Sequence, residues 1–114
     1  MDELLSRLPL REPTFFILLS LSPGPKHGYA ILKEVESLSE GRVLLSTGTL
    51  YGAIKRLLDD GWIRRVDDPL PNGTDRERKA YALTEQGRRV LNAEIERLRK
   101  LVNVAQMQAN QEQV

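Results

Sequence analysis

The chain has no cysteine and a single histidine, His27, among its 114 residues. Without thiols it cannot form disulfides or bind zinc through cysteine, and one imidazole leaves little for metal binding or general-base catalysis. Apolar runs are short: the longest, residues 15–19, falls far below the roughly 20 residues that cross a bilayer. Asp2 and Glu3 stand where a signal peptide would be basic. We therefore expect a cytoplasmic protein with no metal, no cofactor and no membrane partner.

An excess of charge of either sign is absent as well. Seventeen Lys and Arg stand against sixteen Asp and Glu, which leaves a formal net charge of +1. Bulk charge therefore does not indicate a nucleic-acid partner, and any such interpretation must come from local arrangement. The chain does have 40% hydrophobic and 29% charged residues. This is the composition of a globular domain, and the length fits one compact core.

Three helices are predicted in the first half of the chain. Residues 14–21 follow a proline and are apolar on nearly every side, which indicates a buried helix. Residues 28–39 place apolar side chains at spacings of three and four, and residues 47–60 do the same after Ser46, a good N-cap. Residues 43–45, between these two helices, favour a brief strand. The first half is therefore expected to be mainly helical.

The helix predicted at residues 47–60 has two different faces. Leu50 and the apolar residues that follow it form a buried face, and Gly61 ends the helix. The opposite face carries small, hydroxyl-bearing and cationic residues: Thr47, Gly48, Tyr51, Gly52, Lys55 and Arg56. These residues are concentrated toward the helix start, from which side chains of a recognition helix reach base edges in the major groove.

The second half of the chain predicts a hairpin and a long helix. Residues 62–66 and 79–83 favour strands, and the loop between them is rich in Asp, Pro, Asn and Gly. A long helix begins at Thr84. Its apolar residues alternate steps of four and three, as in a coiled-coil seam: Leu91, Ile95, Leu98, Val102, Ala105 and Ala109. Such a seam has little to pack on inside one short chain, so we expect it to pair two copies.

This order of elements predicts an α+β fold that is mostly α, namely a winged helix-turn-helix with a long C-terminal dimerisation helix. We expect residues 1–83 to form the winged-helix DNA-binding domain and residues 84–114 to form the dimerisation helix of the same compact unit. In this design the third helix enters the major groove of DNA, which is about 12 Å wide and admits one α-helix.

Three segments of the sequence are distinctive and occur in a fixed order: residues 27–29 (HGY), 48–51 (GTLY) and 78–87 (RKAYALTEQG). They resemble the signature segments of the PadR family of transcriptional regulators, and the resemblance spans about residues 8–91. The short length with one C-terminal helix is similar to the compact branch of that family. The resemblance implies a homodimeric winged-helix transcriptional repressor that leaves its operator in response to a small molecule or cellular stress.

The resemblance also implies DNA contacts. In proteins that this sequence resembles, the tyrosine equivalent to Tyr29 faces the DNA backbone; the alternative is a core aromatic. Thr49 and Tyr51 lie where the family's recognition helix begins, with simple packing as the alternative. A lysine on the same side as Tyr51 is placed to meet a phosphate. The predicted DNA-binding residues are Tyr29, Ser46, Thr47, Thr49, Tyr51, Lys55, Arg76, Arg78 and Lys79. Acidic residues are interleaved with the wing cations, so contact between the wing and DNA is left open.

A homodimer would place two copies of the module on one double-stranded operator. Two linked half-sites raise the effective concentration for the second binding event, and recognition helices roughly 34 Å apart require a pseudo-palindrome. The predicted dimerisation residues are Leu91, Ile95, Leu98, Val102 and Ala105. Some small members of the family hold planar aromatic compounds between aromatic residues of paired C-terminal helices. This chain has no aromatic residue after Tyr81, so a small-molecule effector is expected only as an unidentified partner.

Two other function classes are weighed against a DNA-binding regulator. A winged helix can serve as a protein-interaction module, which the near-neutral charge supports and the polar, cationic third helix opposes. An enzyme is the other class. The sequence has no Gly-rich phosphate loop, no nucleophile with a base at hand and no paired carboxylates in an apolar setting, so we expect no catalytic residues.

Overall fold

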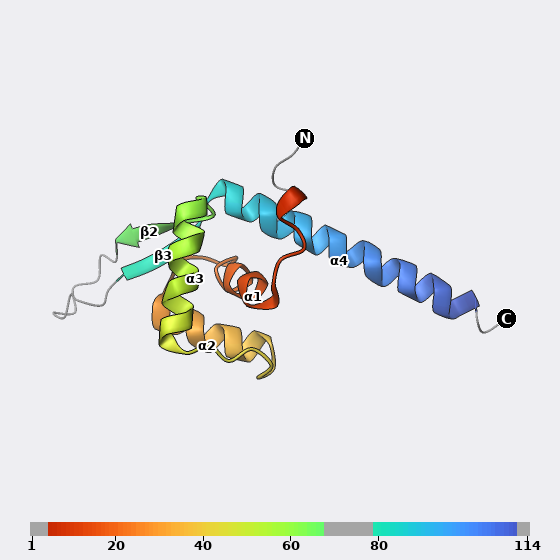
Figure 1. Cartoon of the computed structure of the whole chain (residues 1–114), viewed down its shortest axis with the longest axis horizontal. Helices are drawn as coiled ribbons and strands as arrows, with labels where there is room; N and C mark the ends of the chain where they lie inside the picture. Colours follow the sequence, from red (N-terminus) through yellow and green to blue (C-terminus); the bar gives the residue numbers. More distant parts are fainter. Residues whose placement is uncertain (1–4, 68–78, 112–114) are drawn as a thin grey trace.

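The computed structural model describes residues 5–67 and 79–111. Within these ranges, helices and a small antiparallel sheet form a body from which one long helix extends (Figure 1). The elements run in the order η1 (Leu5–Arg7), α1 (Glu12–Ser20), β1 (Lys26–His27), α2 (Gly28–Leu38), α3 (Thr47–Asp60), β2 (Ile63–Asp67), β3 (Lys79–Leu83) and α4 (Glu85–Gln111).

The first two helices supply the centre of the core. α1 begins at Glu12, two residues before the predicted start, because Pro13 is tolerated in the first turn, where a missing N–H costs no helical hydrogen bond. Ile17 of α1 is fully buried, and α2 contributes Ile31 and Val35 to the same core. The predicted α2 is confirmed to within one residue at its end.

The third helix, α3, covers the predicted residues, Thr47–Asp60. Ser46 caps its start, and the Ser46 Oγ atom accepts a hydrogen bond from the Thr49 N–H at 3.1 Å. Gly61 ends the helix with a φ of 79°, a left-handed conformation that residues with side chains rarely adopt. One face of α3 enters the core through Leu50, Ala53, Ile54 and Leu57.

The sheet joins three segments that are far apart in the sequence. β3 lies between β1 and β2 and is antiparallel to both, with Lys26 opposite Tyr81 and Ile63 opposite Leu83. β3 covers the predicted strand, and β2 is shifted by one residue from its predicted position. The hairpin is therefore confirmed, but β1 was not expected.

The strand predicted at residues 43–45 is wrong. These residues connect α2 and α3 without regular structure. The Val43 N–H donates to the Ser39 Oγ atom at 3.0 Å, and the Val43 side chain is buried while Leu44 is exposed. The Ser39 side chain thus provides a hydrogen-bond partner for the Val43 N–H, and the Val43 side chain packs in the core. This apolar run therefore needs no partner strand.

The start of α4 is fixed against the end of α3. The Thr84 Oγ1 atom donates a hydrogen bond to the Gly61 carbonyl at 2.6 Å, and the Thr84 N–H donates to the Trp62 carbonyl at 3.0 Å. The same hydroxyl accepts from the Gly87 N–H at 3.0 Å, as an N-cap does. Gly87 lies directly on the Trp62 carbonyl, where a Cβ atom would clash. The two helices are therefore joined by backbone contacts and not only by side chains.

The two halves of α4 have different surroundings. In the first half, Val90, Leu91 and Glu94 are at most 2% exposed. The Glu94 carboxylate accepts two hydrogen bonds from Arg97, at 2.7 and 2.9 Å, and one from the Leu10 N–H at 3.1 Å. These bonds hold the N-terminal segment against α4. In contrast, all residues from 99 to 111 are exposed, and Figure 1 shows this half extending away from the body.

The burial of the first half of α4 corrects the predicted dimer seam. Leu91 is 1% exposed within its own chain, and Ile95 is partly buried against the same core. Leu91 therefore has no surface left for a second copy. Leu98 is also partly buried, so the part of the seam that is exposed consists of Val102 and Ala105.

The arrangement is a winged helix-turn-helix with a long C-terminal helix, mostly helical with a small sheet, as the sequence predicts. α2 and α3 form the helix-turn-helix, and β2 and β3 form the base of the wing. The tip of the wing, with Arg76 and Arg78, lies outside the described residues.

Candidate nucleic-acid interface

The start of α3 presents hydroxyl groups to solvent. Thr47, Thr49 and the preceding Ser46 are all exposed. Ser46 acts as the helix cap, because its hydroxyl accepts from the Thr49 N–H and donates to the Thr49 Oγ1 atom at 2.9 Å. The cap thus holds the Thr49 hydroxyl in place. These residues lie together where the N-terminal side chains of a recognition helix reach base edges.

Tyr51, at the start of the second turn of α3, lies across the start of α2. Its hydroxyl group and ring touch the position that a Cβ atom would take on Gly28, and the Tyr51 Cζ atom is 2.8 Å from that position. Any side chain at residue 28 would therefore displace the tyrosine. The Tyr51 side chain is still 44% exposed, so it packs on α2 with one part and faces solvent with another.

Tyr29, at the start of α2, is not a core aromatic, which was one of the two alternatives. It is 68% exposed, and the Lys33 Nζ atom lies 5.8 Å from the centroid of its ring. A phenol and an ammonium group lie together on the exposed side of α2. Both group types donate hydrogen bonds to phosphate oxygens in protein–DNA contacts.

A groove of about 370 Å³ lies between α3 and the sheet. Its cationic lining comes from Lys55 of α3, Arg65 of β2 and Lys79 of β3, and its carboxylate is that of Asp59. Lys55 is 79% exposed, and its Nζ atom is 3.9 Å from the Asp59 carboxylate. An exposed pair at this distance is weak, so Lys55 remains available to another anion. The groove therefore carries an excess of positive charge along α3 from Tyr51 to Asp59.

Tyr81 also lines this groove and is buried, with 3% of its surface exposed. Burial raises the pKa of the Tyr81 phenol, the nearby Tyr51 raises it further, and Arg65 acts in the opposite direction. The phenol therefore stays neutral near pH 7, so it adds no negative charge that would offset the three cations.

Sequence reasoning missed Arg65 and Lys33. In β2, Ile63 is buried against the core, and the alternation of a strand places Arg65 on the same side, next to α3. The alternation could have revealed Arg65 once the strand was predicted. The position of Arg56 differs from the prediction. It was expected on the polar face of α3, but it lies on the side of that helix facing the N-terminal segment.

The residues from 17 to 93 match the family described as Transcriptional regulator PadR-like family. The chain belongs to this family. The matched range extends from α1 into α4 and includes both strands of the wing. The PadR-like family and its fold are those of transcriptional regulators and not of enzymes.

Solved structures of PadR proteins share this fold. A PadR family transcription regulator from Clostridium difficile R20291 has a TM-score of 0.70 and 24% identity, over 85% of this chain and 97% of that chain. Bacillus subtilis PadR, solved in complex with operator DNA, has a TM-score of 0.63 and 28% identity, over 73% of this chain and 46% of that chain. The second of these is a PadR protein bound to its operator.

A curated relative comes from Streptomyces fradiae and is described as an uncharacterized 37.1 kDa protein in transposon TN4556. It is 33% identical over 90 residues, which make up 79% of this chain and 24% of that protein. The PadR-like chain thus spans about a quarter of the length of this relative.

None of the helices in residues 5–67 and 79–111 is long and apolar enough to span a membrane. The same residues contain no group of three or more histidine or carboxylate side chains placed to hold a metal ion.

Proposed function

We propose that this PadR-like protein is a sequence-specific DNA-binding transcriptional repressor that acts in the cytoplasm as a homodimer. The observation that carries the proposal is the cationic groove that runs along α3 from Tyr51 onward, after the exposed hydroxyl groups at the start of the same helix. Hydroxyl groups that can read bases and cations that can hold phosphates thus lie on or beside one helix, α3. Base contacts specify a sequence and phosphate contacts position the protein, so a DNA reader needs both.

The groups divide naturally between these two tasks. Thr47 and Thr49, at the start of α3, would contact base edges, with Ser46 holding the second of them in place. Tyr51 fixes α3 on α2 and offers its exposed part to the same groove. The phosphate contacts would come from Tyr29, Lys33, Lys55, Arg65 and Lys79, with Arg76 and Arg78 of the wing tip in addition.

The uncovered half of α4 supports the homodimer. Leu98, Val102 and Ala105 lie seven, eleven and fourteen residues after Leu91, so they continue the helix face that packs on the body. Val102 is 52% exposed, and nothing among the described residues covers it. A second copy related by a two-fold axis covers the strip with its own strip. Residues 84–114 then dimerise the DNA-binding domain formed by residues 1–83.

Two such domains read a pseudo-palindromic operator whose half-sites lie about one helical turn apart. A change in the angle between the paired α4 helices would shift the two α3 helices out of register with these half-sites. Release from DNA by a small molecule or a stress signal then requires no other conformational change.

The experiment is a selection of bound sequences from random DNA duplexes, followed by fluorescence anisotropy at two salt concentrations. We expect an enriched pseudo-palindrome that binds at least 100-fold tighter than a scrambled duplex, and an affinity that falls steeply with salt. The same duplex placed at a promoter should lower reporter expression when the protein is present. Selection that yields no enriched sequence would contradict the proposal.

Substitutions identify the surface that binds. Lys55→Gln and Arg65→Gln each remove one phosphate contact, so each should reduce the salt slope by about 1 and weaken operator and scrambled duplexes alike. Lys100→Gln, an exposed lysine on α4, is the control and should change neither. Equal losses in all three variants would show that only general charge matters.

The alternative function is a protein-interaction module. It would be favoured if Lys55→Gln and Arg65→Gln left DNA affinity unchanged while the homodimer persisted. The polar and cationic lining beside α3 argues against it, because the centre of a protein interface is depleted in charged residues.

A further inference from the structure

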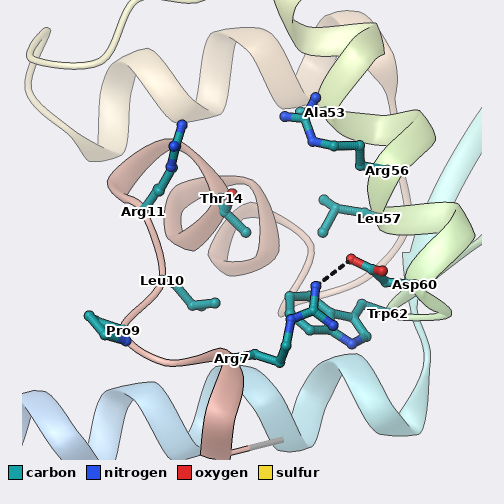
Figure 2. Close-up of a pocket in the computed structure, with 10 residues that line it drawn as sticks. All are labelled: Arg7, Pro9, Leu10, Arg11, Thr14, Ala53, Arg56, Leu57, Asp60 and Trp62. Atoms are coloured by element: carbon teal, nitrogen blue, oxygen red, sulfur yellow. Dashed lines mark hydrogen bonds and ion pairs between the residues drawn. The ribbon is translucent and has the colours of Figure 1, made fainter.

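A second cavity, of about 290 Å³, lies on the side of α3 opposite the groove of the nucleic-acid interface. Its walls are the N-terminal segment from Arg7 to Arg11, the first turn of α1, the second half of α3 and the residue Trp62 (Figure 2). The volume is at the lower end of the roughly 300–1,000 Å³ found for small-molecule sites. None of the candidate DNA contacts lines this cavity.

The charges that line the cavity are unbalanced. Three guanidinium groups, those of Arg7, Arg11 and Arg56, meet one carboxylate, that of Asp60, which gives the lining a net charge of +2. Arg7 pairs with Asp60, with the Nη2 and Oδ2 atoms 3.0 Å apart. Within residues 5–67 and 79–111, neither Arg11 nor Arg56 has an ion-pair partner. Two guanidinium groups at one cavity are therefore left to an external anion.

The arginines are not scattered over the cavity. Figure 2 shows Arg11 and Arg56 at one end, the Arg7–Asp60 pair beside Trp62 at the other, and Thr14 and Leu57 between them. The Arg7 guanidinium lies over the Trp62 ring, with its Cζ atom 4.8 Å from the ring centroid. One end is thus purely cationic, whereas the other offers both a donor and an acceptor.

We propose that this cavity binds a small organic phosphate. The phosphate group lies between Arg11 and Arg56, whose planar guanidinium groups suit paired hydrogen bonds to its oxygens. The phosphate carries a charge of about −1.5 to −2 at pH 7, which matches the excess charge of the lining better than a single carboxylate does. Hydroxyl or amino groups in the rest of the molecule bond to the Asp60 carboxylate and the Arg7 guanidinium.

The position of the cavity couples it to both functional helices. Arg56 and Asp60 belong to α3, the helix that carries the candidate base contacts. The opposite wall belongs to the segment that Leu10 ties to Glu94 of α4 through the 3.1 Å hydrogen bond. A ligand that bridges the two walls therefore changes how α3 sits relative to α4. This consequence for regulation rests on the proposed function, whereas binding of the phosphate does not.

Trp62 provides a direct readout of binding, because it is the one tryptophan of the chain and lines the cavity. The purified full-length protein is titrated with inorganic pyrophosphate, adenosine 5′-monophosphate and glucose 6-phosphate, at constant ionic strength, while its tryptophan emission is recorded. Adenosine and glucose serve as the matched uncharged compounds. We expect a saturable change in emission with adenosine 5′-monophosphate or glucose 6-phosphate and no change with the uncharged counterpart, adenosine or glucose.

Variants locate the binding site. Arg11→Gln and Arg56→Gln should each weaken binding at least tenfold, and both side chains are exposed, so the fold should be retained, as circular dichroism would show. Arg99→Gln, an exposed arginine on α4, should bind as the unchanged protein does. The absence of any saturable change with all three phosphates overturns the proposal, as does binding that survives the double variant Arg11→Gln/Arg56→Gln.

The regulatory consequence has its own measurement. Operator affinity is compared by anisotropy with and without a saturating amount of the compound that changes Trp62 emission. A change of at least fivefold, absent in Arg56→Gln, supports coupling through α3. An affinity that stays within twofold overturns the coupling but leaves the phosphate site intact, and failure to find an operator affects the proposed function alone.

Discussion

The two halves of α4 show how one amphipathic helix is divided between folding and assembly. In the half near the body, Val90 and Leu91 are at most 1% exposed; in the far half, Leu101 and Val102 are 53% and 52% exposed. The spacing of apolar residues is the same in both halves, and only the surface opposite them differs. Periodicity therefore predicts that a face will be covered, but it does not say whether the chain itself or another molecule covers it.

The largest effect is expected from truncating the near half. Leu91→Ala removes a side chain that is 1% exposed, so it should lower the free energy of unfolding by about 2–5 kcal/mol. Urea denaturation at a protein concentration that keeps the chain monomeric measures this loss. Leu101→Ala, the same change in the exposed half, should cost less than about 0.5 kcal/mol under these conditions. Equal losses in the two variants would remove the distinction between the halves.

A charge placed in the far half of α4 tests whether this exposed half is covered by a second copy of the chain. Val102→Glu would bury a carboxylate without a partner in the proposed homodimer, so the dissociation constant should rise at least 100-fold, or about 2.7 kcal/mol. Sedimentation velocity over a concentration series measures this change. Met107→Glu is the control, because Met107 is 64% exposed on another side of the helix. If both variants dissociate the dimer equally, the strip through Val102 is not the seam.

A smaller effect is expected at Glu94, where the near half holds the N-terminal segment. Glu94→Gln weakens charged hydrogen bonds to Arg97 and the Leu10 N–H, which should cost about 1.5–3 kcal/mol near pH 7. Glu96→Gln, in an exposed pair with Arg99, should cost less than about 0.5 kcal/mol. Urea midpoints of both variants give the comparison, and a Glu94 variant as stable as the parent would contradict it.

The pH dependence of stability follows from the same carboxylate. The hydrogen bond from Arg97 holds the pKa of Glu94 below its ordinary value of 4.5, against the effect of burial. The stabilisation is therefore fully present above about pH 4.5 and is lost as the pH falls through the lowered pKa of the folded state. The parent protein should lose stability more steeply than Glu94→Gln in this acid range. Parallel slopes would show that Glu94 is not the group responsible.

The helices were predictable because their signals are local. The N-cap Ser46, the apolar spacing after it and the terminal Gly61 all lie within or next to the helix that they define, and α3 has the expected bounds. The hairpin strands β2 and β3 were predictable for the same reason. The resemblance to PadR proteins depended on short segments that the structure brings into contact, as Gly28 and Tyr51 show.

The features that were missed depend on partners far away in the sequence. β1 has two residues, too few for a periodic pattern, and it is a strand only because β3 lies beside it. No sequence pattern singled out Glu94, which is buried and accepts hydrogen bonds from the distant Leu10 N–H and from Arg97. The phosphate cavity is hidden for the same reason, since Arg11 and Arg56 are brought together only by folding.

The hydrogen bonds of Thr84 to Gly61 and Trp62 join the end of α3 to the start of α4, so a change in the angle between the two helices pivots at this joint. α4 has 27 residues, so its arm is about 40 Å long. A turn of about 5° at the joint moves the far end by ~3 Å, comparable to the rise of one base pair. Two copies held together at their far ends would convert a slight rotation into a mismatch with DNA. The length of α4 alone can therefore make DNA binding sensitive to a small rotation at the joint.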